Sequence, residues 1–246
     1  MATETGPALG AITSRVTRIW GGEIRLVEDL GEVNMADGDT LVDFVAWAAK
    51  EYPADKYVLI LSDHGMGWPG GWSDPDPKAQ ANNRAPLAQA IGNNLFLSEL
   101  DDALAKVQQT TGIEKFELIG MDACLMGHIE VMSALEPYAN YAVVSQETEP
   151  ALGWAYTSFL NSLSQNPDMT GAELSTAIVT SYIKDDQRIL DDAERAAMTG
   201  RNPMGSLFAS GPSAQDVANQ MGRNVTLTAA DLAGAGAHGG CQRPFI

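Results

Sequence analysis

One histidine and one cysteine each follow a short apolar segment, and each lies in a turn flanked by glycine. His64 lies in the block SDHGMGW at 62–68, and Cys124 lies in the block MDACLMG at 121–127. A thiol beside an imidazole can act as a nucleophile, because the imidazole takes the thiol proton and returns it to a leaving amine. These two blocks therefore indicate thiol chemistry, provided that the fold brings them together.

The segments that precede the two blocks have the pattern of buried strands. A continuous apolar run at 57–62 is typical of a strand covered on both faces, and 116–120 and 141–145 are predicted as a second and a third strand. They alternate with helical patterns, an order that predicts right-handed crossovers and a mainly parallel sheet. Ligands bind outside the carboxyl ends of such strands, so we expect His64 and Cys124 to leave the same sheet edge.

Other elements are expected around this sheet. Helical spacing of apolar residues predicts helices at 39–52, 99–109, 125–135, 155–165 and 172–198. Asp39 or Thr40 would cap the first of them and Ser98 the second. A short strand is predicted at 24–27, a long loop at 65–94, and a weakly periodic tail from residue 200.

The predicted start of the helix at 125–135 bears on the thiol. The positive end of a helix dipole favours the thiolate form of a cysteine beside it. The backbone N–H groups of Gly65 and Cys124 would be free to hold an oxyanion. The competing interpretation is that Cys124 is a small buried hydrophobic residue and His64 an ordinary surface or core residue. The spacing alone leaves both interpretations open.

Composition limits the class of protein and its partners. The 246 residues hold 15 Lys and Arg against 32 Asp and Glu, a net charge of −17, which disfavours nucleic acid and anionic membrane surfaces and favours basic peptides. Two cysteines are too few for a disulfide framework or a cysteine-based zinc site. No apolar run has the length of about 18 residues that a membrane span needs, so no membrane insertion is expected. The first twenty residues lack the pattern of a signal peptide.

The two blocks resemble the His and Cys blocks of the clostripain-like cysteine peptidases, a family of the caspase–gingipain–legumain clan. The flanking segments LGEVNM at 30–35, SQETEP at 145–150 and NVTLTAADL at 224–232 resemble that family as well. The resemblance covers about residues 24–232. It implies a caspase-like three-layer α/β/α sandwich with a mostly parallel central sheet, and an endopeptidase that cleaves after Arg or Lys through a thioester acyl-enzyme.

The resemblance also implies roles for particular residues. His64 would be the general base and acid, Cys124 the nucleophile, and Gly65 with Cys124 the oxyanion donors. Asp122 would line the pocket for the basic P1 side chain; the alternative is a carboxylate that caps the following turn. Glu149, in the acidic segment 147–149, would add to the pocket rim or lie in a solvated loop.

Further expectations follow from the family. Its members often mature by self-cleavage between the two blocks, so Lys78 and Arg84 are candidate self-cleavage sites, or else two ordinary surface charges. No cofactor is required by the sequence, although the resemblance allows calcium. It also implies a secreted or cell-envelope location, and we expect a monomer.

The family normally begins with one more strand and helix than this sequence carries. We therefore expect a sheet that lacks its first strand, with a disordered or truncated lead-in at 1–23, a peptidase domain at 24–232 that is incomplete at both ends, and a ragged tail at 233–246. An inactive truncated domain that serves only as a binding module or remnant is the alternative function.

A metal-dependent hydrolase is a third interpretation of the same residues. Asp63, His64 and Asp122 would be the ligands, but the sequence lacks a second well-spaced histidine. His128 lies four residues after Cys124, where a Cys/His metal pair is conceivable and a helix-surface histidine is the ordinary case. We expect no metal site.

Overall fold

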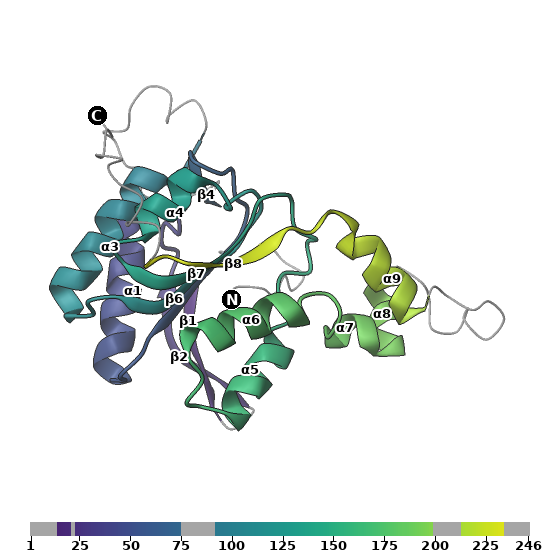
Figure 1. Ribbon diagram of the computed structural model, residues 1–246. Coiled ribbons are helices and arrows are strands. Elements are labelled where there is room, and N and C mark those ends of the chain that lie inside the picture. The colour runs from purple at the N-terminus through teal and green to yellow at the C-terminus, as the bar shows by residue number, and fades with distance from the viewer. Residues whose placement is uncertain (1–13, 21–22, 75–91, 199–212, 234–246) are drawn as a thin grey trace.

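A four-stranded sheet forms the centre of the computed structural model, which describes residues 14–20, 23–74, 92–198 and 213–233. Its strands are β3 (Val58–Ser62), β6 (Phe116–Asp122), β7 (Ala139–Ser145) and β8 (Leu227–Asp231), in the order β3-β6-β7-β8 (Figure 1). The first three are parallel and β8 is antiparallel to β7. The predicted mostly parallel sheet is confirmed, and β8 is an addition to it.

Helices cover both faces of this sheet. On one face lie α1 (Gly38–Glu51), α3 (Leu97–Thr111) and α4 (Ile129–Leu135); on the other lie α5 (Tyr156–Gln165) and α6 (Gly171–Ser181) (Figure 1). The three-layer α/β/α architecture expected from the sequence is thereby confirmed.

Alternation along the strands divides the hydrophobic core in two. Ile119 packs with α1, α3 and α4, whereas its neighbour Leu118 packs with Phe159 of α5 and Ile178 of α6. All four side chains are buried. Successive side chains of a strand point to opposite faces, so continuous apolar sequences are what a sheet covered twice requires.

The helix starts differ from the predictions by a few residues. Asp37, and neither Asp39 nor Thr40, caps α1, because its carboxylate accepts the Asp39 N–H at 2.9 Å. Helix α3 begins before Ser98, with Phe96 at its N-cap position. At the far end of α3, Gly112 adopts a left-handed φ of 73° that ends the helix.

The single helix predicted at 172–198 is wrong: three helices replace it. These are α6, α7 (Gln187–Leu190) and α8 (Asp192–Met198). The helical conformation ends at Tyr182. The next residue, Ile183, has a φ of +66°, a conformation that β-branched residues rarely adopt. Asp186 then caps α7 by accepting the Arg188 N–H at 2.8 Å.

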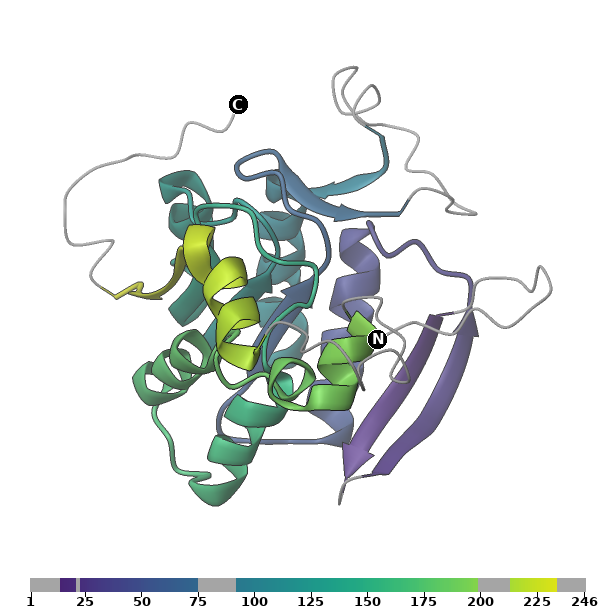
Figure 2. The ribbon, with the colours of Figure 1, turned by 90° about the vertical axis from the view of Figure 1, so that its right-hand side faces the viewer.

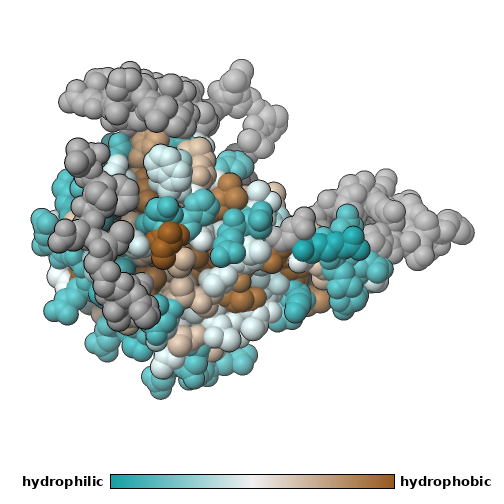
Figure 3. Space-filling view, turned by 45° about the horizontal axis from the view of Figure 1, so that its top comes forward, coloured by the Kyte–Doolittle hydropathy of each residue, from teal (hydrophilic) through white to brown (hydrophobic). Residues whose placement is uncertain are grey.

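Part of the predicted lead-in is an ordered hairpin. Strand β1 (Ser14–Trp20) pairs antiparallel with β2 (Glu23–Gly31), so the disorder expected for 1–23 does not extend to residues 14–20 and the strand predicted at 24–27 is longer (Figure 2). Ile19 and Ile24, which are paired across the hairpin, and Leu26 are all exposed. Figure 3 shows one face of the molecule, where hydrophobic patches lie among hydrophilic residues.

Two further segments correct the prediction of loops. Within the loop predicted at 65–94, β4 (Gly70–Ser73) pairs antiparallel with β5 (Asn94–Phe96) at the end of that range, and the two strands lie above the central sheet in Figure 2. Beyond residue 212, α9 (Ala214–Met221) and a short 3₁₀ helix (Gly222–Asn224) lead into β8. Helix α9 starts with a capping box between Ser213 and Asp216.

One edge of the central sheet bears on the expectation that its first strand is missing. Among the described residues β3 pairs with a strand on one side only, so β3 is an edge strand of the central sheet.

Helices in the described part of the chain are all too short or too polar to cross a membrane.

Candidate active site

The parallel pairing of β3 with β6 brings the two sequence blocks to one edge. Ser62 and Asp122 are the last partners in register, and the Asp63 N–H donates to the Asp122 carbonyl at 3.3 Å. His64 and Cys124 each lie two residues beyond that pair. The expectation that both leave the same sheet edge is therefore met by the register of the strands.

The two turns touch at Gly65. A Cβ atom built there would lie 2.1 Å from the Cys124 carbonyl oxygen and 3.0 Å from the Met126 side chain, so only glycine fits. Gly65 also pairs with Gly71 in an isolated antiparallel β-bridge. The neighbours of Gly65 make its hydrogen bonds: the His64 carbonyl accepts the Trp72 N–H, and the Met66 N–H donates to the Gly70 carbonyl, both at 2.8 Å. The Gly65 N–H takes no part in this bridge and has no hydrogen-bond partner within the described residues.

Cys124 does not lie at the start of a helix, so that prediction is wrong. Helix α4 begins at Ile129, with His128 as its N-cap residue. Instead the Glu149 N–H points at the Cys124 Sγ, with a nitrogen-to-sulfur distance of 3.3 Å. The donor beside the sulfur thus comes from the backbone of a neighbouring loop and not from the start of a helix.

The residue after the cysteine is strained. Leu125 has a φ of +63°, and its N–H donates to the Glu147 carbonyl at 3.2 Å. A left-handed conformation at a non-glycine residue persists only where the surroundings enforce it, and such residues gather at functional sites. The turn holds Cys124 half-buried, with its backbone N–H unpaired within the described chain.

His64 is exposed to solvent at this edge. His128, predicted as a helix-surface residue, packs instead against the turn that carries His64: a Cβ atom at Gly67 would lie 2.9 Å from its imidazole Cε1. The second glycine of the His64 block is thus explained by a close contact to the Cys124 block.

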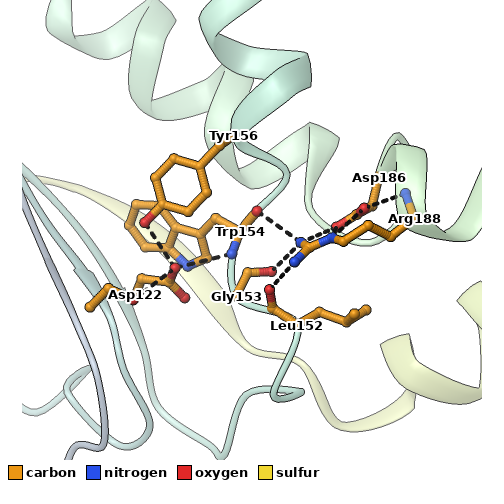
Figure 4. Close-up of polar contacts among 8 residues, drawn as sticks. Asp122, Leu152, Gly153, Trp154, Tyr156, Asp186 and Arg188 are labelled. Carbon is orange, nitrogen blue, oxygen red and sulfur yellow. Dashed lines mark hydrogen bonds and ion pairs between the residues drawn. The ribbon is translucent and has the colours of Figure 1, made fainter. Parts of the chain in front are cut away.

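Asp122 points away from the following turn. Its Oδ2 accepts from the Trp154 N–H at 3.1 Å, the Tyr156 hydroxyl at 2.9 Å and the Ser62 hydroxyl at 3.4 Å (Figure 4). The alternative in which Asp122 caps that turn is therefore wrong. With 6% of its surface exposed, Asp122 is a buried carboxylate held by three donors.

Glu149 lies beside Asp122, whereas Glu147 is exposed. The indole N–H of Trp154 donates to the Glu149 Oε2 at 3.2 Å, and the buried Oε1 has no partner. Burial, and next the negative charge of Asp122, raise the pKa of Glu149 to about 8. Of the two acids in this segment, one therefore faces the interior and the other faces solvent.

The loop that contacts Asp122 is fixed by an arginine that sequence reasoning missed. Arg188, on α7, donates to the carbonyls of Leu152, Gly153 and Trp154 and forms an ion pair with buried Asp186 (Figure 4). Gly153 has a φ of +69°, and a Cβ atom there would lie 2.9 Å from the Asp122 Oδ2. We refer to Asp186 and Arg188 as the loop clamp.

Two tyrosines close the same region. Tyr156 donates to Asp122, and Tyr182, the residue directly after α6, is buried. Burial raises the pKa of Tyr156 and of Tyr182, with a further contribution from the charges of Asp122 and Glu149. Both hydroxyls therefore remain protonated donors throughout the neutral range.

The residues proposed for a metal do not form a metal site. Asp63 and His64 are exposed, whereas Asp122 is turned toward Trp154 and Tyr156. Within the residues that the structure describes, no group of three His, Cys, Asp or Glu could hold an ion. Lys78 and Arg84, the candidate self-cleavage sites, lie outside the described residues.

Comparison with known proteins identifies the family. The model of the clostripain family matches residues 16–194 of this chain. The chain belongs to the clostripain family. Over 118 residues it is 32% identical to clostripain of Hathewaya histolytica, a match that covers 43% of this chain and 19% of that protein.

A solved structure supports the fold. This chain is similar to a secreted C11 cysteine protease from Bacteroides thetaiotaomicron, with a TM-score of 0.58, 19% identity, and coverage of 90% of this chain and 53% of that one. The chain thus spans about a fifth of clostripain and about half of the solved protease. The caspase-like fold of the clostripain family is confirmed.

Gly65→Ala tests the contact between the two turns. The added methyl would overlap the Cys124 carbonyl, so we expect a loss of about 1–3 kcal/mol in the free energy of unfolding and a changed rate of Cys124 alkylation by iodoacetamide. Gly222→Ala is the matched control, because nothing lies within 4 Å of a Cβ atom there. Equal stability and alkylation in both variants would contradict the close contact.

Arg188→Ala tests the loop clamp. It leaves buried Asp186 without its cation, so we expect a loss of about 2–3 kcal/mol, below that of a fully buried pair because Arg188 is partly exposed. Arg25→Ala removes an ion pair in which both side chains are exposed, and should change stability by less than about 0.5 kcal/mol. Urea unfolding of both variants measures the difference, and a similar loss in both would argue against the clamp.

Glu149→Gln tests the buried acid through its pH dependence. Because folding raises the pKa of Glu149, the native state binds more protons than the unfolded chain between about pH 4.5 and 8, so wild-type stability falls as pH rises through that window. The Gln variant lacks this contribution. The stability difference, variant minus wild type, should therefore grow from pH 5 to pH 8 in urea unfolding, whereas a constant difference would refute the raised pKa.

Proposed function

We propose that this chain is a cysteine endopeptidase that cleaves peptide bonds after Arg or Lys. One observation carries the proposal: the turns bearing His64 and Cys124 touch, and a buried carboxylate, Asp122, lies two residues before the thiol. Membership of the clostripain family supports the reaction class.

The proposed reaction uses the chain's own groups. His64 takes the proton of the Cys124 thiol, and the thiolate attacks the scissile carbonyl carbon to form a C–S bond. The backbone N–H groups of Gly65 and Cys124, both unpartnered in the described residues, donate to the oxyanion. Collapse breaks the C–N bond while His64 returns the proton to the amine, and water then hydrolyses the thioester.

The basic preference rests on Asp122 and Glu149. A guanidinium or ammonium placed between these carboxylates would form charge-assisted hydrogen bonds in a site largely shielded from water. The net charge of −17 would also attract basic peptide segments to the whole molecule.

Partners and location follow from the same proposal. The substrates would be basic peptides or proteins, bound by a monomer, with no nucleic acid and no membrane insertion. The reaction needs no cofactor, and calcium has no assigned residue here. Secretion is proposed by analogy with the secreted protease of B. thetaiotaomicron. Self-cleavage at Lys78 or Arg84 remains part of the proposal.

Fluorogenic peptides ending in Arg, Lys or Asp test the function. We expect cleavage after Arg and Lys only, inhibition by iodoacetamide, and a loss of at least about 10³-fold in Cys124→Ala. Asp122→Asn should lower kcat/KM by roughly 30-fold or more, since loss of a buried charge partner costs about 2–5 kcal/mol. Glu147→Gln, which removes an exposed carboxylate that faces solvent and not the pocket, is the control expected to retain activity.

The alternative of a binding module makes the opposite prediction. A folded, monodisperse sample that cleaves none of these peptides would refute the endopeptidase and favour the inactive domain. Full activity in Cys124→Ala would refute the assigned nucleophile alone.

A further inference from the structure

Two buried polar atoms near the thiol have no hydrogen-bond partner among the described residues. They are the Oε1 of Glu149 and the hydroxyl oxygen of Tyr182, whose side chain is 5% exposed. Buried polar atoms in native proteins are almost always paired, so each exception calls for an explanation. Two exceptions in one site suggest that the missing partner is a ligand.

The two atoms belong to the same small region. The Tyr182 hydroxyl and the Glu149 carboxyl lie close enough for Tyr182 to lower the pKa of Glu149 and for Glu149 to raise that of Tyr182, although neither unpaired atom has a partner within hydrogen-bond distance and geometry. The charges of Asp122 and Cys124 also raise the pKa of Tyr182, so these groups lie near it. The backbone N–H of Glu149 in turn points at the Cys124 Sγ at 3.3 Å. A group that reached both unpaired atoms would thus lie close to the nucleophile.

The donors available differ between the two carboxylates. Asp122 accepts from three donors, namely Ser62, Trp154 and Tyr156. Glu149 accepts from one indole N–H, so an ionised Glu149 would leave a charged oxygen buried without a donor and next to a second negative charge. Retaining its proton avoids that cost when the site is empty.

A basic side chain supplies what the empty site lacks. A guanidinium carries five N–H donors and an ammonium three, and neither accepts hydrogen bonds. One such group can donate to the Glu149 Oε1, the Tyr182 hydroxyl oxygen and Asp122 together. We propose that Tyr182 and Glu149 form the inner end of the pocket for the P1 cation, and that Glu149 releases its proton when the cation binds.

This inference rests on the proposed function, because it assumes that the pocket takes a basic P1 side chain. The exchange balances: a neutral Glu149 and a cation give a carboxylate–cation pair and one proton released to solvent. Several titratable or charged groups from the surrounding elements interact electrostatically with Glu149 or with Tyr182 beside it. They are Asp122, Cys124, Tyr156, Tyr182 and Arg188. Of these, Asp122 contributes most to keeping Glu149 protonated.

Benzamidine, a small cation that resembles the end of an arginine side chain, is the probe. Calorimetric titration in two buffers of different ionisation enthalpy counts the protons released on binding. We expect nearly one proton at pH 7 for the wild type, and an affinity that increases roughly tenfold per pH unit between pH 6 and 7.5. Glu149→Gln should release none and bind with little pH dependence, and the exposed Glu147→Gln is the matched control that should behave as wild type.

Tyr182→Phe tests the hydroxyl without changing shape. We expect benzamidine to bind about tenfold more weakly while proton release is retained, a combination that a general loss of structure would not produce. Benzamidine binding without proton release in the wild type, or unchanged proton release in Glu149→Gln, would overturn the exchange. Unchanged affinity in Tyr182→Phe would overturn the role of the hydroxyl.

Failure of the proposed function gives a different result. In that case the wild type would neither bind benzamidine nor cleave after Arg or Lys, and both proposals would fall. Cleavage after Arg or Lys together with pH-independent benzamidine binding would leave the endopeptidase in place and refute this inference alone.

Discussion

The contact between Gly65 and the Cys124 carbonyl is the constraint on which the candidate site depends. Parallel strands bring their carboxyl ends to one edge of the sheet, but the turns that follow can touch only where no side chain stands between them. Here the absence of a side chain at Gly65 lets the two turns meet, with 2.1 Å between the position of a Cβ atom and the carbonyl oxygen. The turns that carry the imidazole and the thiol are thereby held in contact.

A second constraint is the burial of charge beneath that contact. Asp122 is held by donors from the segment 153–156, and the loop clamp holds the carbonyls of the same segment. The peptide unit between Gly153 and Trp154 thus has its N–H toward the Asp122 carboxylate and its C=O toward the Arg188 guanidinium. The clamp therefore positions the donors that stabilise Asp122, although Arg188 lies on a helix more than sixty residues later in the sequence.

Local patterns in the sequence were enough to predict the parallel strands of the central sheet and the position of the His64 and Cys124 blocks at one edge of it. The segments at 57–62 and 116–120 are mostly apolar, as strands covered on both faces require, so their ends could be placed. The start of α4 could not, because the left-handed Leu125 is enforced by a carbonyl from a distant loop. Tyr182 and Arg188 were missed for a similar reason. Their helical pattern hid a break for which the capping Asp186 was the one local signal.

The energetic arrangement of the two acids argues for a ligand rather than for stability. Burial of Glu149, and next the neighbouring charge of Asp122, raise its pKa to about 8, which means that the ionised form is disfavoured in the folded chain. A glutamine would keep the indole hydrogen bond and remove the repulsion, so folding alone gives no reason for an acid at this position. An acid is useful there if a cation binds, since a carboxyl that stays protonated in the empty site can ionise and attract the cation when the site is filled. The same pair of acids then accounts for an unsatisfied oxygen in the free chain and for selectivity toward a basic side chain in the complex.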